Sequence, residues 1–138
     1  MSHHTRGRKA DHKPAADAIS GMRAPPRGMG KDAKAEWRRI MPALISRRVL
    51  TEADIGAVES YCTAFGDARE ARTTIAADGA YITTRLGELK RHPAFTTLRE
   101  AAGEARRWAA ELGITPASRS RVNGSSEEED SAGTRMDL

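Results

Sequence analysis

The feature that most constrains the fold of this chain is a seam of small apolar residues toward its C-terminal end. Its members recur at alternating intervals of three and four residues: Phe95, Leu98, Ala102, Ala105, Ala109 and Leu112. Such spacing places side chains along one face of a helix. Because half of the seam is alanine, another helix, from the same chain or from a second copy, can approach it closely. We predict a helix over about residues 93–112, opened by Pro93 and closed at Gly113.

A second helix is predicted upstream, over about residues 32–45. Apolar residues share one face there: Ala33, Trp37, Ile40, Met41 and Leu44. Asp32 is expected to cap the amino end, and Pro42, which has no amide hydrogen, to kink or end the helix. Since Trp37 is in register with the apolar face, we expect it to pack in the core and not to stack on a base.

The helix predicted over about residues 51–77 has the clearest start. Thr51 can cap its amino end, and Asp54, three residues later, can return a hydrogen bond, which is the pattern of a capping box. The apolar face comprises Ile55, Val58, Tyr61, Cys62, Phe65, Ala68 and Ile75. Arg69 and Arg72 fall beside this face and are expected to extend to solvent.

Residues 80–90 predict a small β-hairpin after a helix stop at Gly79. Residues 81–84 favour a strand, residues 85–88 resemble a turn, and Leu89 begins a short return strand. Two strands alone are marginal in water, so the hairpin is expected to pack on a helix or on a neighbouring subunit. The predicted fold is therefore mainly α, with three main helices and a hairpin between the second and the third.

The flanks of this helical segment differ from it in composition. Residues 1–30 contain three prolines and little apolar periodicity, and residues 119–138 include an acidic run at 127–130. Neither flank can bury enough apolar surface to order itself, so both are predicted to be disordered. The folded part, a helical oligomerisation core, is expected over residues 31–118.

Positive charge is concentrated at the N-terminal end. Against a net charge of +4 for the chain, residues 1–31 contribute +5, from seven Lys or Arg and two Asp. Residues 32–118 contribute +1, from thirteen basic and twelve acidic side chains, and residues 119–138 contribute −2, from three and five. A basic arm on a nearly neutral body favours a polyanionic partner such as DNA. The alternative is an arm that only aids solubility.

No catalytic or metal-binding pattern appears in the sequence. There is no HExxH, CxxC, GxGxxG, GxSxG or Walker-type loop, and His3, His4 and His12 fall in the arm predicted to be disordered. Cys62 is alone, which excludes an intrachain disulfide and suits a reducing cytoplasm. No apolar run approaches the roughly 18–20 residues of a membrane span. We therefore expect no enzyme, no cofactor, no metal site and no membrane partner.

Bulky side chains are scarce. Aromatic residues make up 4% of the chain and hydrophobic residues 38%, so a monomer would have a thin core. Small cores are often completed by association of several copies. We expect core and subunit packing to fall on Trp37, Ile55, Val58 and Phe65, together with the alanine-rich seam of residues 95–112.

Several short motifs follow one another along the chain. They are Lys34-Ala35-Glu36-Trp37, Ile40-Met41-Pro42-Ala43-Leu44, Val49-Leu50-Thr51-Glu52-Ala53-Asp54, Tyr61-Cys62, Asp78-Gly79, the strand near Tyr81, Gly87, His92-Pro93 and Leu112-Gly113-Ile114-Thr115-Pro116-Ala117-Ser118-Arg119-Ser120-Arg121. No single piece is specific, whereas the ordered set, which ends in Leu-Gly-x-Thr-Pro-x-Ser-Arg, is much more so. The set covers roughly residues 31–122 and resembles a family of phage terminase small subunits, of the P-twenty-seven type. One difference is His92, where we expect a smaller polar residue such as Asn.

The resemblance implies a mostly helical protein that forms a homo-oligomeric ring. Members of that family recognise concatemeric viral DNA, and they recruit and regulate a large terminase subunit, which carries the ATPase and the nuclease. The implied partners are double-stranded viral DNA, the large subunit and further copies of the chain. A phage- or prophage-encoded protein of this kind acts in the host cytoplasm and is itself non-catalytic.

Candidate DNA-binding residues lie in the basic arm and at its junction with the first helix. They are Arg6, Arg8, Lys9, Arg23, Arg27, Lys31, Lys34 and Arg38. A second candidate patch is Arg85, Lys90 and Arg91 in the hairpin, where an ordinary charged turn is the simpler interpretation. Arg119 and Arg121 are candidates for contact with the large subunit or a neighbouring protomer. The acidic tail is a candidate for docking the motor or mimicking DNA.

Two other functions compete with this interpretation. A helix-turn-helix transcription regulator is the main alternative, because two predicted helices span the chain from Trp37 to Phe65. Against it, the link over residues 42–50 is longer than the usual three or four residues. In addition, Glu52 and Asp54 are unfavourable at the start of a helix that enters the major groove. The other competing hypothesis is a structural or protein-binding module with a solvated tail.

Overall fold

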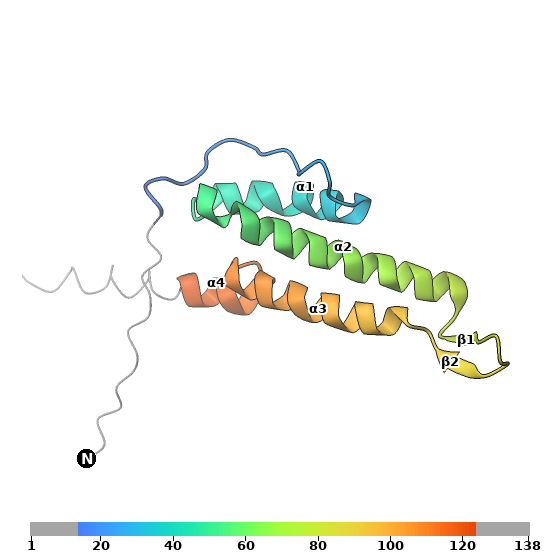
Figure 1. The fold of residues 1–138 in the computed structure, drawn as a ribbon. Helices are drawn as coiled ribbons and strands as arrows, with labels where there is room; N and C mark the ends of the chain where they lie inside the picture. The colour runs from blue at the N-terminus through green and yellow to red at the C-terminus, as the bar shows by residue number, and fades with distance from the viewer. Residues whose placement is uncertain (1–13, 124–138) are drawn as a thin grey trace, which may run out of the picture.

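Helices dominate the fold (Figure 1). The computed structural model describes residues 14–123, with side chains up to residue 119. In chain order the elements are α1 (Lys31–Ser46), the short 3₁₀ turn η1 (Glu52–Asp54), α2 (Ile55–Asp78), β1 (Tyr81–Thr83), β2 (Leu89–Arg91), α3 (Ala94–Glu111) and α4 (Pro116–Asn123). This order confirms the predicted mainly α fold with a hairpin between the second and third main helices.

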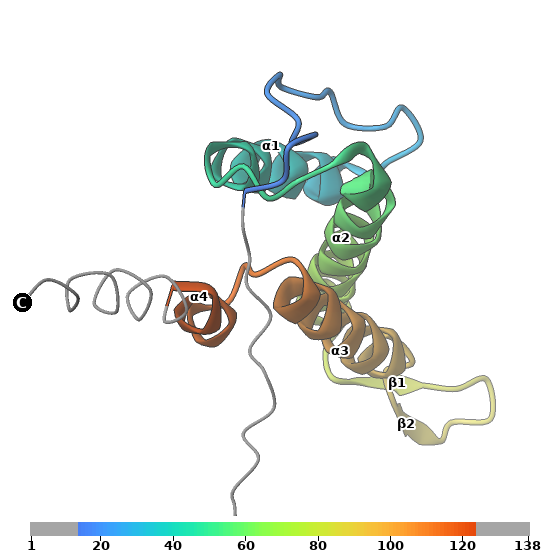
Figure 2. The ribbon, with the colours of Figure 1, turned by 90° about the vertical axis from the view of Figure 1, so that its left-hand side faces the viewer.

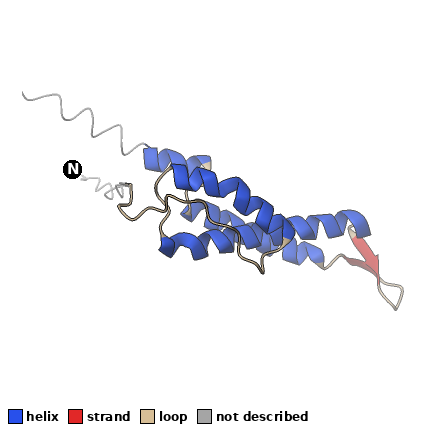
Figure 3. Cartoon of the chain, turned by 90° about the horizontal axis from the view of Figure 1, so that it is seen from above, coloured by secondary structure: helices blue, strands red, loops and turns tan. Residues whose placement is uncertain are grey.

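The central helix is α2, and both α1 and α3 pack against it. Seen end-on, the three helices form an open arc with α2 in the middle (Figure 2). The antiparallel strands pair Tyr81 with Arg91 and Thr83 with Leu89, and their hairpin projects from one end of the α2–α3 pair (Figures 1 and 3). The two sides of the α2–α3 pair are therefore not equivalent, because one faces the inside of the arc and the other faces outward.

The amino end of α1 is capped by a different residue from the one predicted. Its N-cap is Gly30, and Asp32 lies in the first turn, where its charge is favourable beside the positive end of the helix dipole. The helix does not end at Pro42 but continues for one more turn. Pro42 is exposed, so water can hydrate the carbonyl that lacks a helical partner. The buried side chains of Met41 and Leu44 keep this last part of the helix on the core.

The caps predicted for α2 and α3 are confirmed. The Thr51 amide and hydroxyl both donate to Asp54 Oδ2 at 2.8 Å, which stabilises the first turn. At the other end of α2, Gly79 has a φ of 91°, and its amide donates to the Ile75 carbonyl at 2.8 Å. Gly113 follows α3 with a φ of 67°. Both glycines adopt left-handed backbone that other residues rarely take, so they determine where the helices stop.

His92 takes the capping role at the start of α3. Its Nδ1 accepts a hydrogen bond from the Ala94 amide at 3.0 Å, and its Nε2 lies 3.1 Å from Asp78 Oδ2 at the end of α2. The amide oxygen of an Asn would accept the same kind of bond. The longer ring of His92 does so and also reaches α2, which explains why this chain differs from the smaller polar residue expected here.

A fourth helix, α4, follows α3 and was not predicted. Pro116 occupies its first turn, and the Thr115 hydroxyl oxygen accepts a hydrogen bond from the Ser118 amide at 3.2 Å. A proline at the first position after a capping threonine is a local helix-start signal that could have found this element. The folded part therefore extends beyond the predicted boundary at residue 118. Residues 124–138 lie outside the described residues.

Residues 14–30 form a strap across α1, and the prediction that they are disordered is wrong. The Ile19 amide donates to the Leu50 carbonyl at 2.8 Å, and the side chains of Ile19 and Met29 are buried in the core. The loop that crosses the helices in Figure 3 is this strap. Residues 1–13, which complete the predicted basic arm, lie outside the described residues.

The core has two unlike halves. Around α1 and the start of α2 it contains large side chains that are at most 1% exposed: Trp37, Met41, Leu44, Val58 and Cys62. Between α2 and α3 it consists of buried alanines: Ala64, Ala68, Ala71, Ala101, Ala105 and Ala109. The other predicted packing residues are only half-buried: Ile55, Phe65, Phe95, Leu98, Ala102 and Leu112. The α2–α3 half thus buries little bulk within one copy of the chain.

Candidate interaction surfaces

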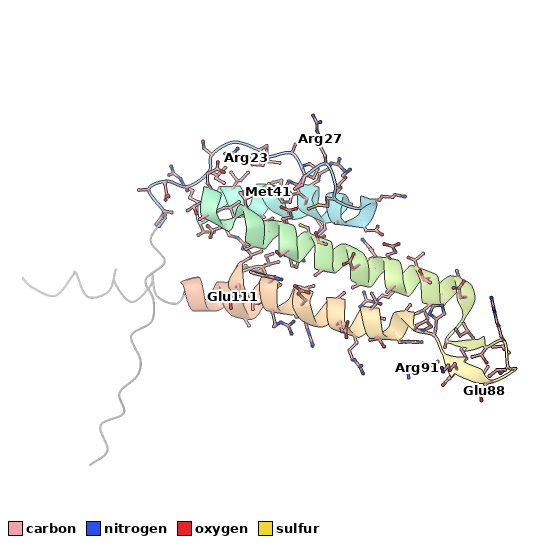
Figure 4. The ribbon with its side chains drawn as sticks, in the orientation of Figure 1. Arg23, Arg27, Met41, Glu88, Arg91 and Glu111 are labelled. Carbon is pink, nitrogen blue, oxygen red and sulfur yellow. The ribbon has the colours of Figure 1, made fainter. Side chains whose placement is uncertain are left out.

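A basic face lies along α1 and the end of the strap. Lys31, Lys34 and Arg38 are spaced by three and four residues, so they share one side of the helix. Arg27 extends away from the strap above α1 (Figure 4). None of these four side chains forms an ion pair within residues 14–123. We call these four residues the α1 basic face, and their free charges suit an anionic partner.

The remaining predicted DNA-binding residues are placed differently. Three lie outside the described residues: Arg6, Arg8 and Lys9. Arg23 lies on the strap, where its guanidinium forms an ion pair with Glu52 and its carbonyl accepts a hydrogen bond from Trp37 Nε1 at 2.8 Å. These two contacts attach the strap to α1 and to the start of α2, so the charge of Arg23 is already partly neutralised.

The hairpin carries both cationic and apolar side chains. Arg85, Lys90 and Arg91 are exposed, and the Arg91 guanidinium lies over the Phe95 ring, 4.0 Å from its centroid. Leu86 and Leu89 are 88% and 71% exposed. The two leucines are three positions apart, and a protein partner can bury exposed apolar side chains of this kind.

An arginine-rimmed groove lies between α2 and α3. Its volume is about 560 Å³, and its lining consists of Tyr61, Phe65, Ala68, Arg69, Arg72, Arg99, Ala102, Ala105, Arg106 and Ala109. The four guanidinium groups are exposed, and none forms an ion pair within the described part of the chain. The Arg69 guanidinium lies over the Phe65 ring, 5.7 Å from its centroid. We call this feature the arginine groove; Arg69 and Arg72 extend to solvent as predicted, but their convergence with Arg99 and Arg106 was not foreseen.

A second, smaller groove between the same two helices is acidic. Its volume is about 330 Å³, and it is lined by Gly56, Glu59, Ser60, Thr63, Ala64, Asp67 and Glu104. Glu59, Asp67 and Glu104 are exposed and form no ion pair within residues 14–123. The side chains around these three carboxylates are small, so a partner can approach the helix backbones closely. We call this feature the acidic groove.

The two grooves lie on opposite sides of the α2–α3 pair. Successive residues of a helix are about 100° apart, so residues two positions apart point in nearly opposite directions. Asp67 of the acidic groove and Arg69 of the arginine groove are such a pair on α2, and Glu104 and Arg106 are such a pair on α3. The α2–α3 pair therefore has a positive side and a negative side.

A buried carboxylate joins α1 to α2 beside the arginine groove. Glu36 is 3% exposed; it accepts hydrogen bonds from the Tyr61 hydroxyl at 2.7 Å and from the Arg39 guanidinium at 2.5 and 2.7 Å. Burial raises the pKa of Glu36, but the hydrogen bonds from Arg39 and Tyr61 outweigh it, so the pKa lies below its ordinary value. Burial and the bond to the carboxylate raise the pKa of Tyr61, which keeps its hydroxyl a donor at neutral pH.

Among the described residues, the Cys62 thiol is not activated and no metal cluster is found. Burial raises the pKa of Cys62 to about 12, so its thiol stays protonated near neutral pH, whereas the thiolate is the reactive form. Within residues 14–123 no three His, Cys, Asp or Glu side chains come together in a way that could hold a metal ion. Every helix of this part of the chain is too short or too polar to cross a membrane.

The connection between α1 and α2 bears on the helix-turn-helix alternative. Residues 47–54 separate the two helices, which is longer than the usual three or four residues. Glu52 pairs with Arg23 and Asp54 caps the helix, so carboxylates stand at the end that would enter a DNA groove. No feature of the described residues favours this alternative.

The structure thus describes a helical scaffold that presents separate charged surfaces, as proteins that act by binding other macromolecules do. Residues 33–129 match the family model described as phage terminase, small subunit. The chain therefore belongs to the phage terminase small-subunit family, as its ordered motifs predict. The matched segment contains both grooves and the hairpin, and it begins after the strap. No curated protein and no solved structure matches the chain.

Proposed function

We propose that this protein binds double-stranded viral DNA, assembles as a homo-oligomeric ring, and recruits and regulates the large terminase subunit during genome packaging in the host cytoplasm. The observation that carries the proposal is the family match over residues 33–129, since membership of this family indicates a role in DNA packaging. In this role the protein performs no chemical step. It positions DNA for the ATPase and nuclease of its partner.

The α1 basic face is the surface that best suits the DNA phosphates. Arg27, Lys31, Lys34 and Arg38 have no ion pair to break within residues 14–123, and each cation that meets a phosphate releases a counterion. Arg6, Arg8 and Lys9 precede this face in the chain and carry three further positive charges. Repetition of the face around a ring multiplies individually weak contacts.

The large subunit requires a surface other than the one that meets DNA. The hairpin projects from one end of the α2–α3 pair (Figure 1) and exposes Leu86 and Leu89. Arg119 on α4 is also exposed, and one guanidinium nitrogen donates to the Ile114 carbonyl at 3.0 Å. A protein partner can bury apolar side chains and pair with cations at the same time, so we assign the large subunit to these two elements.

The DNA-binding step can be tested by measuring affinity for duplex DNA as a function of salt. Replacing Lys31, Lys34 and Arg38 by Gln removes three positive charges and should reduce the slope of log K against log salt by about 3. A matched variant with Gln at Arg85, Lys90 and Arg91 removes the same charge from the hairpin and should leave the slope nearly unchanged. Equal effects of the two variants would show that DNA responds only to net charge and would refute the assigned face.

A further inference from the structure

The α2–α3 pair carries charges of opposite sign on its two sides, and few of them have partners. The arginine groove presents Arg69, Arg72, Arg99 and Arg106, and the acidic groove presents Glu59, Asp67 and Glu104. No ion pair involves any of these seven side chains within the described residues. Glu104 accepts a 3.4 Å hydrogen bond from Trp108 Nε1, and because the indole is neutral, this bond does not compensate the charge of Glu104. Each side of the α2–α3 pair therefore presents charges that can pair with the opposite charges of a partner.

The floor of the arginine groove is apolar. Phe65 and Ala102 are half-buried there, next to the buried Ala68 and Ala105. An occupant that brought only negative charge would leave this floor in contact with water. An occupant that also carries small apolar side chains would bury it, and burial of apolar surface contributes roughly 25 cal/mol per Å².

We propose that the acidic groove of one copy of this chain docks on the arginine groove of the next copy. The inference rests on the proposed assembly into a ring and specifies the two surfaces that build it. Carboxylates of one copy meet guanidinium groups of its neighbour, while the exposed Thr63, whose methyl group is apolar, approaches the floor at Phe65 and Ala102. Such a contact is heterologous, because the two surfaces differ, so an open row of copies keeps one free groove of each sign at its two ends until a closed ring forms.

Two other arrangements fit the charges less well. A symmetric contact between two arginine grooves would place like charges together, which is unfavourable. Docking of the acidic residues 127–130 of the chain itself would supply carboxylates but no apolar side chain to cover Phe65 and Ala102. The acidic groove of a second copy supplies carboxylates together with the exposed methyl group of Thr63.

The experiment uses full-length variants and native mass measurement. In the first variant, Arg72→Glu and Arg99→Glu reverse two of the four positive charges of the arginine groove. In the second variant, Glu59→Arg and Asp67→Arg reverse two of the three negative charges of the acidic groove. Each variant alone should no longer assemble, and its native mass should be the 15.0 kDa of a single chain. An equimolar mixture should assemble again beyond dimers, because the unmodified acidic groove of the first variant fits the unmodified arginine groove of the second, and the two reversed grooves fit each other with the signs exchanged.

The combined variant with all four substitutions restores complementarity with the signs exchanged and should regain the mass of the unmodified assembly. As a control, Glu100→Arg with Arg107→Glu reverses two charges on α3 that line neither groove and should assemble normally. Circular dichroism checks that every variant keeps its helices, so a loss of mass reports the interface and not unfolding.

The outcomes separate this inference from the proposed function. If the unmodified chain is a monomer, the ring itself is wrong and the inference falls with it. If the unmodified chain assembles and both single-groove variants still do, the ring stands and the interface is elsewhere. If assembly is lost when Glu127, Glu128, Glu129 and Asp130 are replaced by their amides, the groove holds the tail. If the first variant assembles but loses DNA affinity, the groove is a DNA site.

Discussion

The two halves of this molecule pack on the same central helix with different kinds of side chain. Toward α1, large side chains such as Trp37, Met41 and Leu44 interlock with α2 under the strap. Toward α3, the contact is made by alanines, and a groove of about 560 Å³ lies beside it, with arginines that form no ion pair within residues 14–123. One half is thus stabilised by large buried side chains within a single copy, whereas the other half leaves the charged groove that we propose as a docking surface.

The largest expected effect is on the α1 half. Trp37→Ala removes a side chain that is 1% exposed and also the hydrogen bond to the Arg23 carbonyl. We expect the free energy of unfolding to fall by about 3–5 kcal/mol, because a cavity remains where the indole packed. Urea unfolding measures this loss, with Trp37→Phe as an intermediate case if the alanine variant does not fold. A loss below about 1 kcal/mol would contradict the division into two halves.

A pair of glycine substitutions compares the halves directly. A β-carbon at Gly66 would lie 2.8 Å from the Ala33 nitrogen on α1, whereas one at Gly103 of α3 would come no nearer than 3.9 Å, to the side chain of Arg107. Gly66→Ala should therefore destabilise by about 2–3 kcal/mol through overpacking. Gly103→Ala should stabilise by about 0.5–1 kcal/mol through helix propensity. Thermal unfolding should move in opposite directions for the two variants, and a shared direction would show that α1 is not held closely against α2.

The buried carboxylate of Glu36 makes the stability of the α1 half depend on pH. The pKa of Glu36 lies below its ordinary value of 4.5, so its charged form stabilises the fold above that value. This contribution is lost as the pH falls through the lower pKa of the folded state. Glu36→Gln should cost about 1–2 kcal/mol at neutral pH and should lose less additional stability below about pH 4.5 than the unmodified chain. The exposed Glu100→Gln should keep the full acid sensitivity; an unchanged acid profile in Glu36→Gln would place the sensitive group elsewhere.

The smallest effect is expected at the surface of the strap. Arg23 and Glu52 form an exposed ion pair, and such pairs contribute about 0–1 kcal/mol. Arg23→Gln should therefore change unfolding by less than about 1 kcal/mol, and, because its charge is already paired, it should weaken DNA binding less than Arg27→Gln. Parallel measurements of unfolding and DNA affinity check both statements. A larger loss of DNA affinity for Arg23→Gln would return Arg23 to the DNA-binding surface.

The elements predicted from local patterns match the structure well. The capping box at Thr51 and Asp54 and the stops at Gly79 and Gly113 depend on contacts within a few residues, and the strands of the hairpin pair residues at most ten positions apart. The strap escaped prediction because Ile19 and Met29 are isolated apolar residues that acquire a core only when α1 and α2 are in place.

The candidate sites were less accessible to prediction. The seam of α3 was expected to pack with Ala102 at its centre, but the neighbouring Ala101 is the more deeply buried residue. A shift of one position rotates a helix face by about 100°, which is enough to turn part of a predicted packing seam into the floor of a groove. The convergence of arginines from α2 and α3 depends on the same rotation.

From its amino-acid order alone, this protein acquires its family motifs, its helix ends and the excess of positive charge at its N-terminal end. Those properties depend on neighbours in the chain, where backbone geometry and capping hydrogen bonds act over three or four residues. The strap across α1 and the opposite charges on the two sides of the α2–α3 pair arose only in the tertiary structure. They depend on how helices distant in sequence are rotated against one another, and packing alone determines that rotation.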